Sequence, residues 1–162
     1  MVQARAQGAV EVSVQHEDFD VGQLTRALSA GRTDVGAVTT FVGLVRGASD
    51  GVQEMTLEHY PGMTEAALAE IADEACRRWA LMAVTVVHRV GALAPGAQIV
   101  FVGVAGAHRG EAFAACEFIM DYLKTRAPFW KKEQTAQGGR WVDAREADDA
   151  AAARWQDVEQ RR

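Results

Sequence analysis

The chain has 162 residues, of which 49% are hydrophobic, and this fits one soluble globular domain with a core of ordinary size. Its 22 acidic residues outnumber its 17 basic residues, and the sequence pI is about 5.4. An acidic chain is unsuited to binding nucleic acid by broad phosphate neutralisation, so we expect no nucleic-acid partner. A small anion would have to meet a local basic patch.

Two features argue against membrane insertion and metal binding. The N-terminus lacks the apolar core of a signal peptide, and the longest nearly apolar stretch, residues 99–107, is too short to span a bilayer. Cys76 and Cys116 form no C-x-x-C pair, so they predict small buried side chains and not a zinc site or a redox dithiol. We therefore expect a cytoplasmic protein without a membrane segment.

The first elements alternate between strand and helix. Valines alternate with polar residues over positions 10–14, which predicts a half-buried strand. Asp20 can then cap a short helix that reaches Gly31. Residues 35–45 are rich in β-branched side chains and nearly uncharged, so they predict a buried strand that ends at Arg46.

The middle of the chain adds a strand and a long helix. A polar loop over residues 47–51 leads to a strand over residues 55–59. Thr64 is placed to cap the helix, whose apolar residues recur at helical spacing as far as Trp79.

The next segment predicts two strands and a second long helix. Apolar runs indicate strands over residues 83–90 and 99–105. A helix over about residues 111–126 follows, and Pro128 ends it.

The C-terminal part predicts a hairpin and a tail. Residues 130–142 are typical of a hairpin that turns at Gly138-Gly139. The remainder is rich in alanine and charge, and is either helical or frayed. Because no linker is evident, we take residues 1–145 as one domain and residues 146–162 as a tail. The order of elements predicts an α+β fold with two main helices and a mixed or antiparallel sheet.

The distribution of lysine is unusual. Fourteen of the 17 basic residues are arginines, and the three lysines, Lys124, Lys131 and Lys132, lie within nine residues of sequence. Of the two residue types, only lysine can lose its proton near neutral pH, in a suitable environment, and act as a base or nucleophile. A chain that otherwise uses arginine can keep lysine where an amine is needed, so this segment is a candidate site.

Lys124 lies at the edge of the apolar face of the predicted helix. That face consists of Phe113, Cys116, Ile119, Met120 and Leu123. Desolvation beside it would disfavour the ammonium and make Lys124 a usable base. The alternative is an ordinary ion pair with Asp121, three residues earlier, and the residues alone slightly favour it.

Lys131 and Lys132 are neighbours on a predicted strand, so their side chains leave opposite faces. Only one of them can join Lys124, and the other is expected to be a solvated edge residue. Arg46, at the end of its strand, could supply a fixed guanidinium, although a single arginine at a strand end is weak evidence.

A second candidate site is the junction between a strand and the helix at His108 and Arg109. Free backbone N–H groups and the positive end of the helix dipole would meet an anion there. The segment 108–132 holds five basic against three acidic residues, but a solvated helix end gives the same count. For His108 alone a structural role is the better interpretation. The other three histidines show no ligand spacing, and no Ser-His-Asp arrangement is evident.

Several longer segments resemble a known family. They are GAVTTFVGLVRG (36–47), LEHYPGMTEAALAEIADEA (57–75), VHRVGALAPG (87–96), FVGVAGAHRGEAF (101–113), FIMDYLKTRAPFWKKE (118–133) and GGRWVDA (138–144). Together they span residues 36–144, and the string MDYLKTRAPFWK is the most specific. On these residues the chain is similar to the MoaE family, the large, catalytic subunits of molybdopterin synthase.

The resemblance implies an α/β hammerhead-type fold and a homodimer that binds two copies of a small ubiquitin-like sulfur carrier, which makes a heterotetramer. It also implies a reaction, in which the carrier's C-terminal Gly-Gly thiocarboxylate supplies sulfur to cyclic pyranopterin monophosphate. The product carries the dithiolene of molybdopterin, for the molybdenum cofactor. The resemblance implies no metal and no separate cofactor for this step.

Position by position, the resemblance places the family's two key lysines on Lys124 and Lys131. The other pocket residues of the family fall on Arg46, His108, Arg109, Lys132 and Glu133. We expect Lys124 to act as general acid and base at the pterin carbon, and Lys131 to hold and polarise the carrier's terminal carbonyl. The two arginines and the histidine are expected to bind the phosphate and pterin, and the remaining two residues to line the pocket.

Two other functions stay open at this point. A protein of the same fold could bind a phosphorylated pterin or a ubiquitin-like partner as a scaffold, without catalysis. A binder of single-stranded RNA could use Phe129, Trp130 and the lysines, but it needs more aromatic and basic surface than this acidic chain offers.

Overall fold

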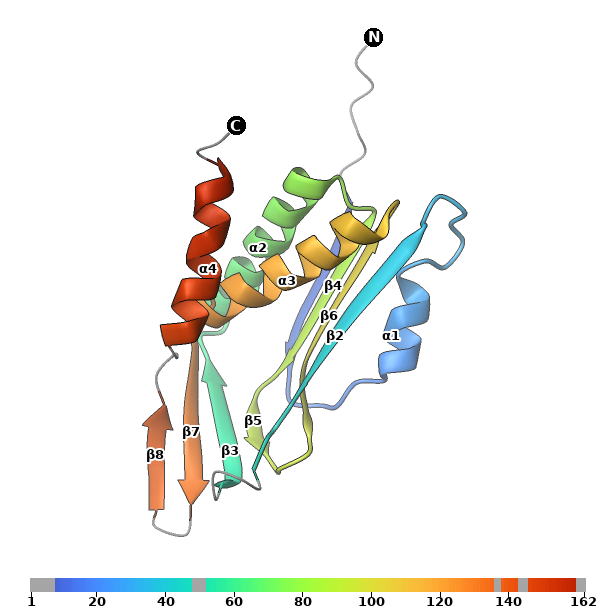
Figure 1. Cartoon of the computed structure of the whole chain (residues 1–162). Helices are drawn as coiled ribbons and strands as arrows, with labels where there is room; N and C mark the ends of the chain where they lie inside the picture. The colour runs from blue at the N-terminus through green and yellow to red at the C-terminus, as the bar shows by residue number, and fades with distance from the viewer. Residues whose placement is uncertain (1–7, 48–51, 136–137, 143–145, 160–162) are drawn as a thin grey trace.

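The computed structural model describes residues 8–47, 52–135, 138–142 and 146–159 (Figure 1). Most of the predicted polar loop, residues 48–51, lies outside this description. The described helices and strands are β1 (Ala9–Gln15), α1 (Val21–Ala27), β2 (Ala37–Leu44), β3 (Val52–His59), α2 (Met63–Trp79), β4 (Ala83–Arg89), β5 (Gly91–Leu93), β6 (Gln98–Gly106), α3 (Arg109–Arg126), β7 (Phe129–Thr135), β8 (Gly138–Val142) and α4 (Glu146–Glu159). Their mixture confirms the predicted α+β class.

The strands form two four-stranded sheets. Sheet A has the order β1-β4-β6-β2, in which β1 runs parallel to β4 and the other pairs are antiparallel. Sheet B has the order β5-β3-β7-β8 and is antiparallel. Both agree with the predicted mixed or antiparallel pairing.

The two long helices cover one face of sheet A. α2 packs on β1 and β4, and α3 packs beside it on β6 and β2 (Figure 1). The short helix α1 lies against β2 and β6 on the other face. The main core forms beneath α2 and α3, and its largest fully buried side chains include Tyr122, Phe118, Leu68 and Ile119. Burial of each such side chain stabilises the fold by about 2 kcal/mol.

β2 is an edge strand, which corrects its prediction as a buried strand. It pairs on one side only, with β6, and its Phe41 and Leu44 are 40% and 55% exposed. An apolar strand indicates that some surface covers it, but the composition does not say whether that surface belongs to the same chain.

The start of α2 differs from the prediction, because Thr64 is not its N-cap. The N-cap is Gly62, whose φ of 85° favours glycine and whose N–H donates to the carboxylate of Glu65 at 2.6 Å. Thr64 is fully buried; its hydroxyl accepts from the N–H of Tyr60 and donates to the carbonyl of Pro128, both at 3.0 Å. This hydroxyl therefore ties the start of α2 to the link between α3 and β7.

α3 is buried on more sides than its periodicity indicates. Four residues of the predicted apolar face are buried, but Phe113 is 63% exposed, which corrects its placement there. Phe118 is buried instead, with its ring 5.2 Å from that of Trp79 in α2 and 5.6 Å from that of Trp155 in α4. The helices that pack on α3 create these extra buried positions, and sequence spacing alone does not reveal them.

The C-terminal hairpin is confirmed, but its turn lies earlier than predicted. Thr135 of β7 pairs with Gly138, the first residue of β8, so residues 136–137 connect the strands and lie outside the described residues. The two glycines therefore belong to β8. After the hairpin, α4 packs on α3, with Ala152 only 7% exposed.

Candidate active site

A small cavity lies where sheet A, sheet B and the C-terminal end of α3 meet. Its volume is about 130 Å³. It is lined by Met55, Leu57, His88, Ile99, Leu123, Lys124, Ala127, Phe129 and Lys131. Lys124 comes from α3 and Lys131 from β7, so the fold brings the two lysines to one cavity with mainly apolar walls.

The link between α3 and β7 positions both lysines. Proline disfavours helical backbone in the residue before it, and Ala127, which precedes Pro128, is extended with φ −82° and ψ 131°. The helix therefore stops with Lys124 in its last turn. In β7, alternate side chains face the cavity, so Phe129 and Lys131 both line it.

Two further predicted residues, Lys132 and Glu133, follow Lys131 in β7. Lys132 is exposed and does not line it, which agrees with the strand alternation that lets only one of the adjacent lysines join Lys124. The main chain of Glu133 pairs with Met55 of β3, and its side chain lies outside the described parts of the structure.

His88 is a further polar residue of the cavity, and sequence reasoning missed it. It follows Val84 and Val86 on the same face of β4 and is 5% exposed. Its ring stacks on that of Phe129, with 3.9 Å between centroids and 22° between planes. The signal that could have found it is a histidine at a position where the strand pattern calls for an apolar side chain.

The His88 ring is neutral. Its Nδ1 lies 2.8 Å from the carbonyl oxygen of Arg89, which can only accept a hydrogen bond, so Nδ1 carries the proton and Nε2 a lone pair. Burial lowers the pKa of His88 from 6.5 to about 4, and the nearby charge of Lys124 acts in the same direction. The cavity therefore combines two amines with one uncharged hydrogen-bond acceptor.

Arg46 lies at the same end of the molecule as the two lysines. The preceding Val45 is held by backbone hydrogen bonds of 2.7 and 2.9 Å to the turn before β6. Its side chain packs in one buried cluster with Met55 and Leu57, which both line the cavity. Arg46 itself is exposed, so the structure places it close to the cavity but not in its wall.

His108 and Arg109 lie at the opposite end of α3. His108 is the N-cap, Arg109 is the first helical residue, and both are exposed, as the predicted strand-to-helix junction requires. A helix rises about 1.5 Å per residue, so about 22 Å separates Arg109 from Lys124 along α3 (Figure 1). Within one chain, the predicted residues therefore form two groups at opposite ends of α3.

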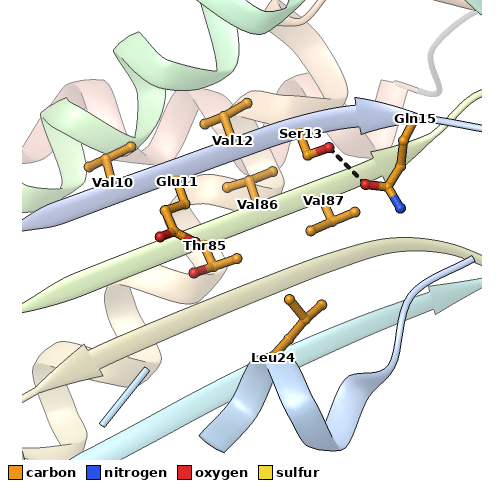
Figure 2. A pocket seen from close by; sticks show the side chains of 9 residues that line it. All are labelled: Val10, Glu11, Val12, Ser13, Gln15, Leu24, Thr85, Val86 and Val87. Carbon is orange, nitrogen blue, oxygen red and sulfur yellow. Dashed lines mark hydrogen bonds between the residues drawn. The ribbon is translucent and has the colours of Figure 1, made fainter. Parts of the chain in front are cut away.

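A larger groove lies elsewhere on sheet A. It runs along β1 and β4 on the face that carries α1, and its volume is about 540 Å³ (Figure 2). It is lined by Val10, Glu11, Val12, Ser13, Gln15, Leu24, Thr85, Val86 and Val87. Two of its polar groups pair with each other, since the Ser13 hydroxyl donates to the Gln15 side chain at 2.7 Å. None of the predicted site residues with a described side chain lines this groove, whereas Lys124 and Lys131 line the smaller cavity.

The thiols do not contribute a nucleophile. Cys76 and Cys116 are buried and free, as predicted. Burial raises the pKa of the Cys76 thiol to about 11 and that of Cys116 to about 12, so both stay protonated near neutral pH. In the described residues, no group of three His, Cys, Asp or Glu side chains is placed to hold a metal ion, and no helix is long and apolar enough to cross a membrane.

Comparisons with known proteins show the family of this chain. The family described as MoaE protein matches residues 14–126. The molybdopterin synthase catalytic subunit of Ralstonia nicotianae is 64% identical over 146 residues, which cover 89% of this chain and 83% of that protein.

Solved structures extend the agreement to the fold. The MoaE protein of Burkholderia ambifaria is 57% identical, with a TM-score of 0.79 over 91% of this chain and 98% of its own. A protein-protein complex of subunits 1 and 2 of molybdopterin-converting factor from Helicobacter pylori is similar in fold, with 21% identity and a TM-score of 0.66 over 85% of this chain and 90% of its own.

An α+β fold with two lysines at one cavity, together with these relatives, defines a class of enzyme: the sulfurtransferases of molybdopterin synthesis. The chain belongs to the MoaE protein family. The predicted hammerhead-type fold and the predicted role as an enzyme of molybdenum cofactor biosynthesis are thereby confirmed.

Proposed function

We propose that this chain transfers sulfur from the C-terminal thiocarboxylate of a small ubiquitin-like carrier protein to cyclic pyranopterin monophosphate, and so forms the dithiolene of molybdopterin. The observation that carries the proposal is the convergence of Lys124 and Lys131, from two elements, on one mainly apolar cavity. The Helicobacter pylori protein of the same fold forms a complex with a second subunit, which supports a small partner subunit here.

The two amines suit a reaction between two anions. Lys131 binds the carrier's terminal carbonyl and polarises it, because a fixed positive charge stabilises the oxyanion that develops there. Lys124 acts as general acid and base at the pterin carbon, since thioester formation and cleavage require proton transfers near neutral pH. The apolar walls lower the local polarity on one side of the amines, which strengthens both charge interactions.

In a homodimer, the second chain supplies the anion-binding residues that lie far from the cavity within one chain. The unpaired edge of β2, with Phe41 and Leu44 partly exposed, is a surface that a second copy can cover. The first residue of β2 lies beside Gly106, at the end of sheet A next to α3's N-terminus, and its last lies beside Gln98, near the lysine cavity.

A two-fold axis across this edge therefore places the start of one β2 against the end of the other. The phosphate and pterin then contact Arg46 and the two lysines from one chain, and His108 and Arg109 from the other. Lys132 and Glu133 lie at the rim, where the carrier's tail enters. With one carrier at each site, the assembly is a heterotetramer.

The proposed location is the cytoplasm. Both cysteines are free thiols, and a chain with free thiols suits a reducing compartment, because disulfides mark oxidising ones.

The test of the proposal is the substitution Lys124→Arg. Arginine keeps the positive charge but does not release a proton near neutral pH. We expect single-turnover conversion of cyclic pyranopterin monophosphate by a thiocarboxylated carrier to slow by about 100-fold or more, because general acid and base catalysis is lost. Carrier affinity, measured by calorimetry, should change by less than about threefold.

Arg26→Lys, on the exposed side of α1, is the matched control and should react at the wild-type rate. A Lys124→Arg variant that also reacts at this rate shows that Lys124 is only an anion clamp. If the wild-type chain binds the carrier but yields no sulfur-containing product, the proposed reaction itself is wrong.

A further inference from the structure

We propose that His88 is a positioning residue of the sulfur-transfer site, whose neutral ring accepts a hydrogen bond at Nε2 from the Lys124 ammonium. The proposal rests on the function proposed above, in which Lys124 transfers protons. It assigns a role to a buried polar group that the two-lysine mechanism does not otherwise use.

The surroundings hold the His88 ring in one orientation. Its backbone lies in the middle of sheet A, paired with Val14 of β1 and Val100 of β6. Nδ1 is engaged by the Arg89 carbonyl at 2.8 Å, and the face of the ring rests on Phe129. These contacts leave Nε2 as the remaining polar atom of a ring that lines the same cavity as Lys124.

The charges around His88 keep that atom an acceptor. Lys124 of α3 and His59 of β3 both act on the ring, and Lys131 of β7 lines the same cavity. His59 is itself 3.4 Å from the carboxylate of Glu65. Protonation would place a positive charge on the buried ring of His88, close to two amines, so Nε2 keeps its lone pair.

A fixed acceptor is useful to a lysine that must transfer protons. The ammonium of Lys124 has three N–H donors on a flexible four-carbon chain, so each acceptor within reach narrows the range of its positions. A hydrogen bond to Nε2 would orient one N–H and leave the other two for the substrate. Holding a catalytic group in place in this way contributes to rate and leaves ground-state binding almost unchanged.

Two substitutions of His88 distinguish the role of its hydrogen-bond acceptor from the role of its aromatic ring. His88→Phe keeps an aromatic ring that can stack on Phe129 but has no acceptor, whereas His88→Gln can place an amide oxygen close to the position of Nε2. We expect kcat to fall by about 10- to 100-fold in the phenylalanine variant, with KM for the pterin changed by less than about threefold, and to recover most of this loss in the glutamine variant. His16→Gln, an exposed histidine on the β1–α1 connection, is the control.

The pH profile distinguishes positioning from a purely structural role. If Nε2 holds the Lys124 ammonium, the limb of the kcat profile that reports Lys124 moves to lower pH in His88→Phe and returns in His88→Gln. An unchanged limb, or a phenylalanine variant with wild-type kcat, overturns the proposal.

A measurement without turnover keeps the proposal independent of the proposed reaction. Ring ¹⁵N spectra of the full chain should show Nδ1 protonated and Nε2 bare, and Lys124→Met should move the Nε2 resonance but not that of Nδ1. An unmoved Nε2 resonance overturns the proposal even if His88→Phe fails to fold. If the wild-type chain transfers no sulfur but the resonance moves, the reaction is wrong and the contact stands.

Discussion

Burial keeps a histidine and the cysteines of this protein uncharged, so the positive charge at the cavity comes from its lysines. The pKa of His88 falls to about 4 and that of Cys116 rises to about 12, in both cases because burial disfavours the charged form. Lys124 is exposed and Lys131 is half-buried, so their amines reach the cavity without complete loss of solvent. The site therefore presents ammonium groups on an uncharged background, which suits anionic reactants.

The lowered pKa of His88 makes stability depend on pH. The unfolded chain binds a proton at His88 near pH 6.5, but the folded chain binds it only near pH 4, so the unfolded state holds more protons between these values. The free energy of unfolding should therefore fall as the pH is lowered through this window, by about 3 kcal/mol in total.

Urea unfolding of the wild type and His88→Gln between pH 7 and pH 4 measures this contribution, because the other titrating groups are common to both chains. The stability of the wild type relative to the variant should decrease by that amount as the pH falls. A difference that stays constant over this range contradicts a buried neutral ring.

Among the helices, α4 contacts the C-terminal part of α3 and supplies the hydrogen-bond donors to Asp121. The carboxylate of Asp121, one turn before Lys124, accepts from Arg154 at 3.0 Å and from the indole N–H of Trp155 at 2.7 Å. The ion pair between Asp121 and Lys124, which the residues alone slightly favour, would have to share this carboxylate with two donors of α4. The Trp155 ring also packs edge-on against that of Trp79 at 5.6 Å.

Apolar packing, more than charge, should hold α4 in place. We expect Trp155→Ala to lower the free energy of unfolding by about 2 to 3 kcal/mol, because it removes a large, half-buried ring and a hydrogen bond to Asp121. Arg154→Ala, its neighbour, removes exposed ion pairs to Glu117 and Asp121 that solvent screens, so its effect should be much smaller and should shrink further in salt. Equal losses in urea unfolding would show that charge holds α4.

For the molecule as a whole, the length of α3 separates the two groups of predicted site residues. His108 and Arg109 lie at one end, and the lysine cavity at the other, about 22 Å away (Figure 1). The edge strand β2 runs between these ends with partly exposed apolar side chains. If a second copy paired across β2, the lysine cavity of one chain would lie next to His108 and Arg109 of the other. Each complete site would then need two chains.

Mixed dimers test this arrangement. Lys124→Ala and Arg109→Ala should each be nearly inactive alone, but a mixed dimer of the two variants contains one site with no substitution. Random exchange of subunits makes about half of the dimers mixed, each with one intact site, so mixing should restore about one quarter of the wild-type activity.

The control is a mixture of Lys124→Ala with Lys131→Ala. Each chain then lacks one lysine of its own cavity, so no site in a mixed dimer is complete, and the mixture should restore no activity. If both mixtures stay inactive although exchange is shown by mass, each site lies within one chain, and the two-fold arrangement across β2 is wrong.

Local patterns predicted the elements that depend on near neighbours. The strands β1, β4 and β6 and the helices α2 and α3 follow periodicity within one segment, and Asp20 caps α1 as predicted, with its carboxylate accepting from Gln23 at 2.8 Å. The errors have distant causes. The Thr64 hydroxyl does not cap α2, because it donates to the carbonyl of Pro128, which is 64 residues away. Helix α3 buries more positions than its spacing predicts, because α2 and α4 pack on it.

The order of amino acids was sufficient to indicate the family and to propose the reacting groups. The string around Lys124 and Lys131 indicates the family. Strand alternation predicts that only one of Lys131 and Lys132 can join Lys124, and the resemblance to the family selects Lys131. Only the folded chain shows that the two lysines share a cavity with His88, and that Arg109 lies at the other end of α3. These relations are distances between segments far apart in sequence, and they are set by sheet register and by the rise of a helix, which no local pattern contains.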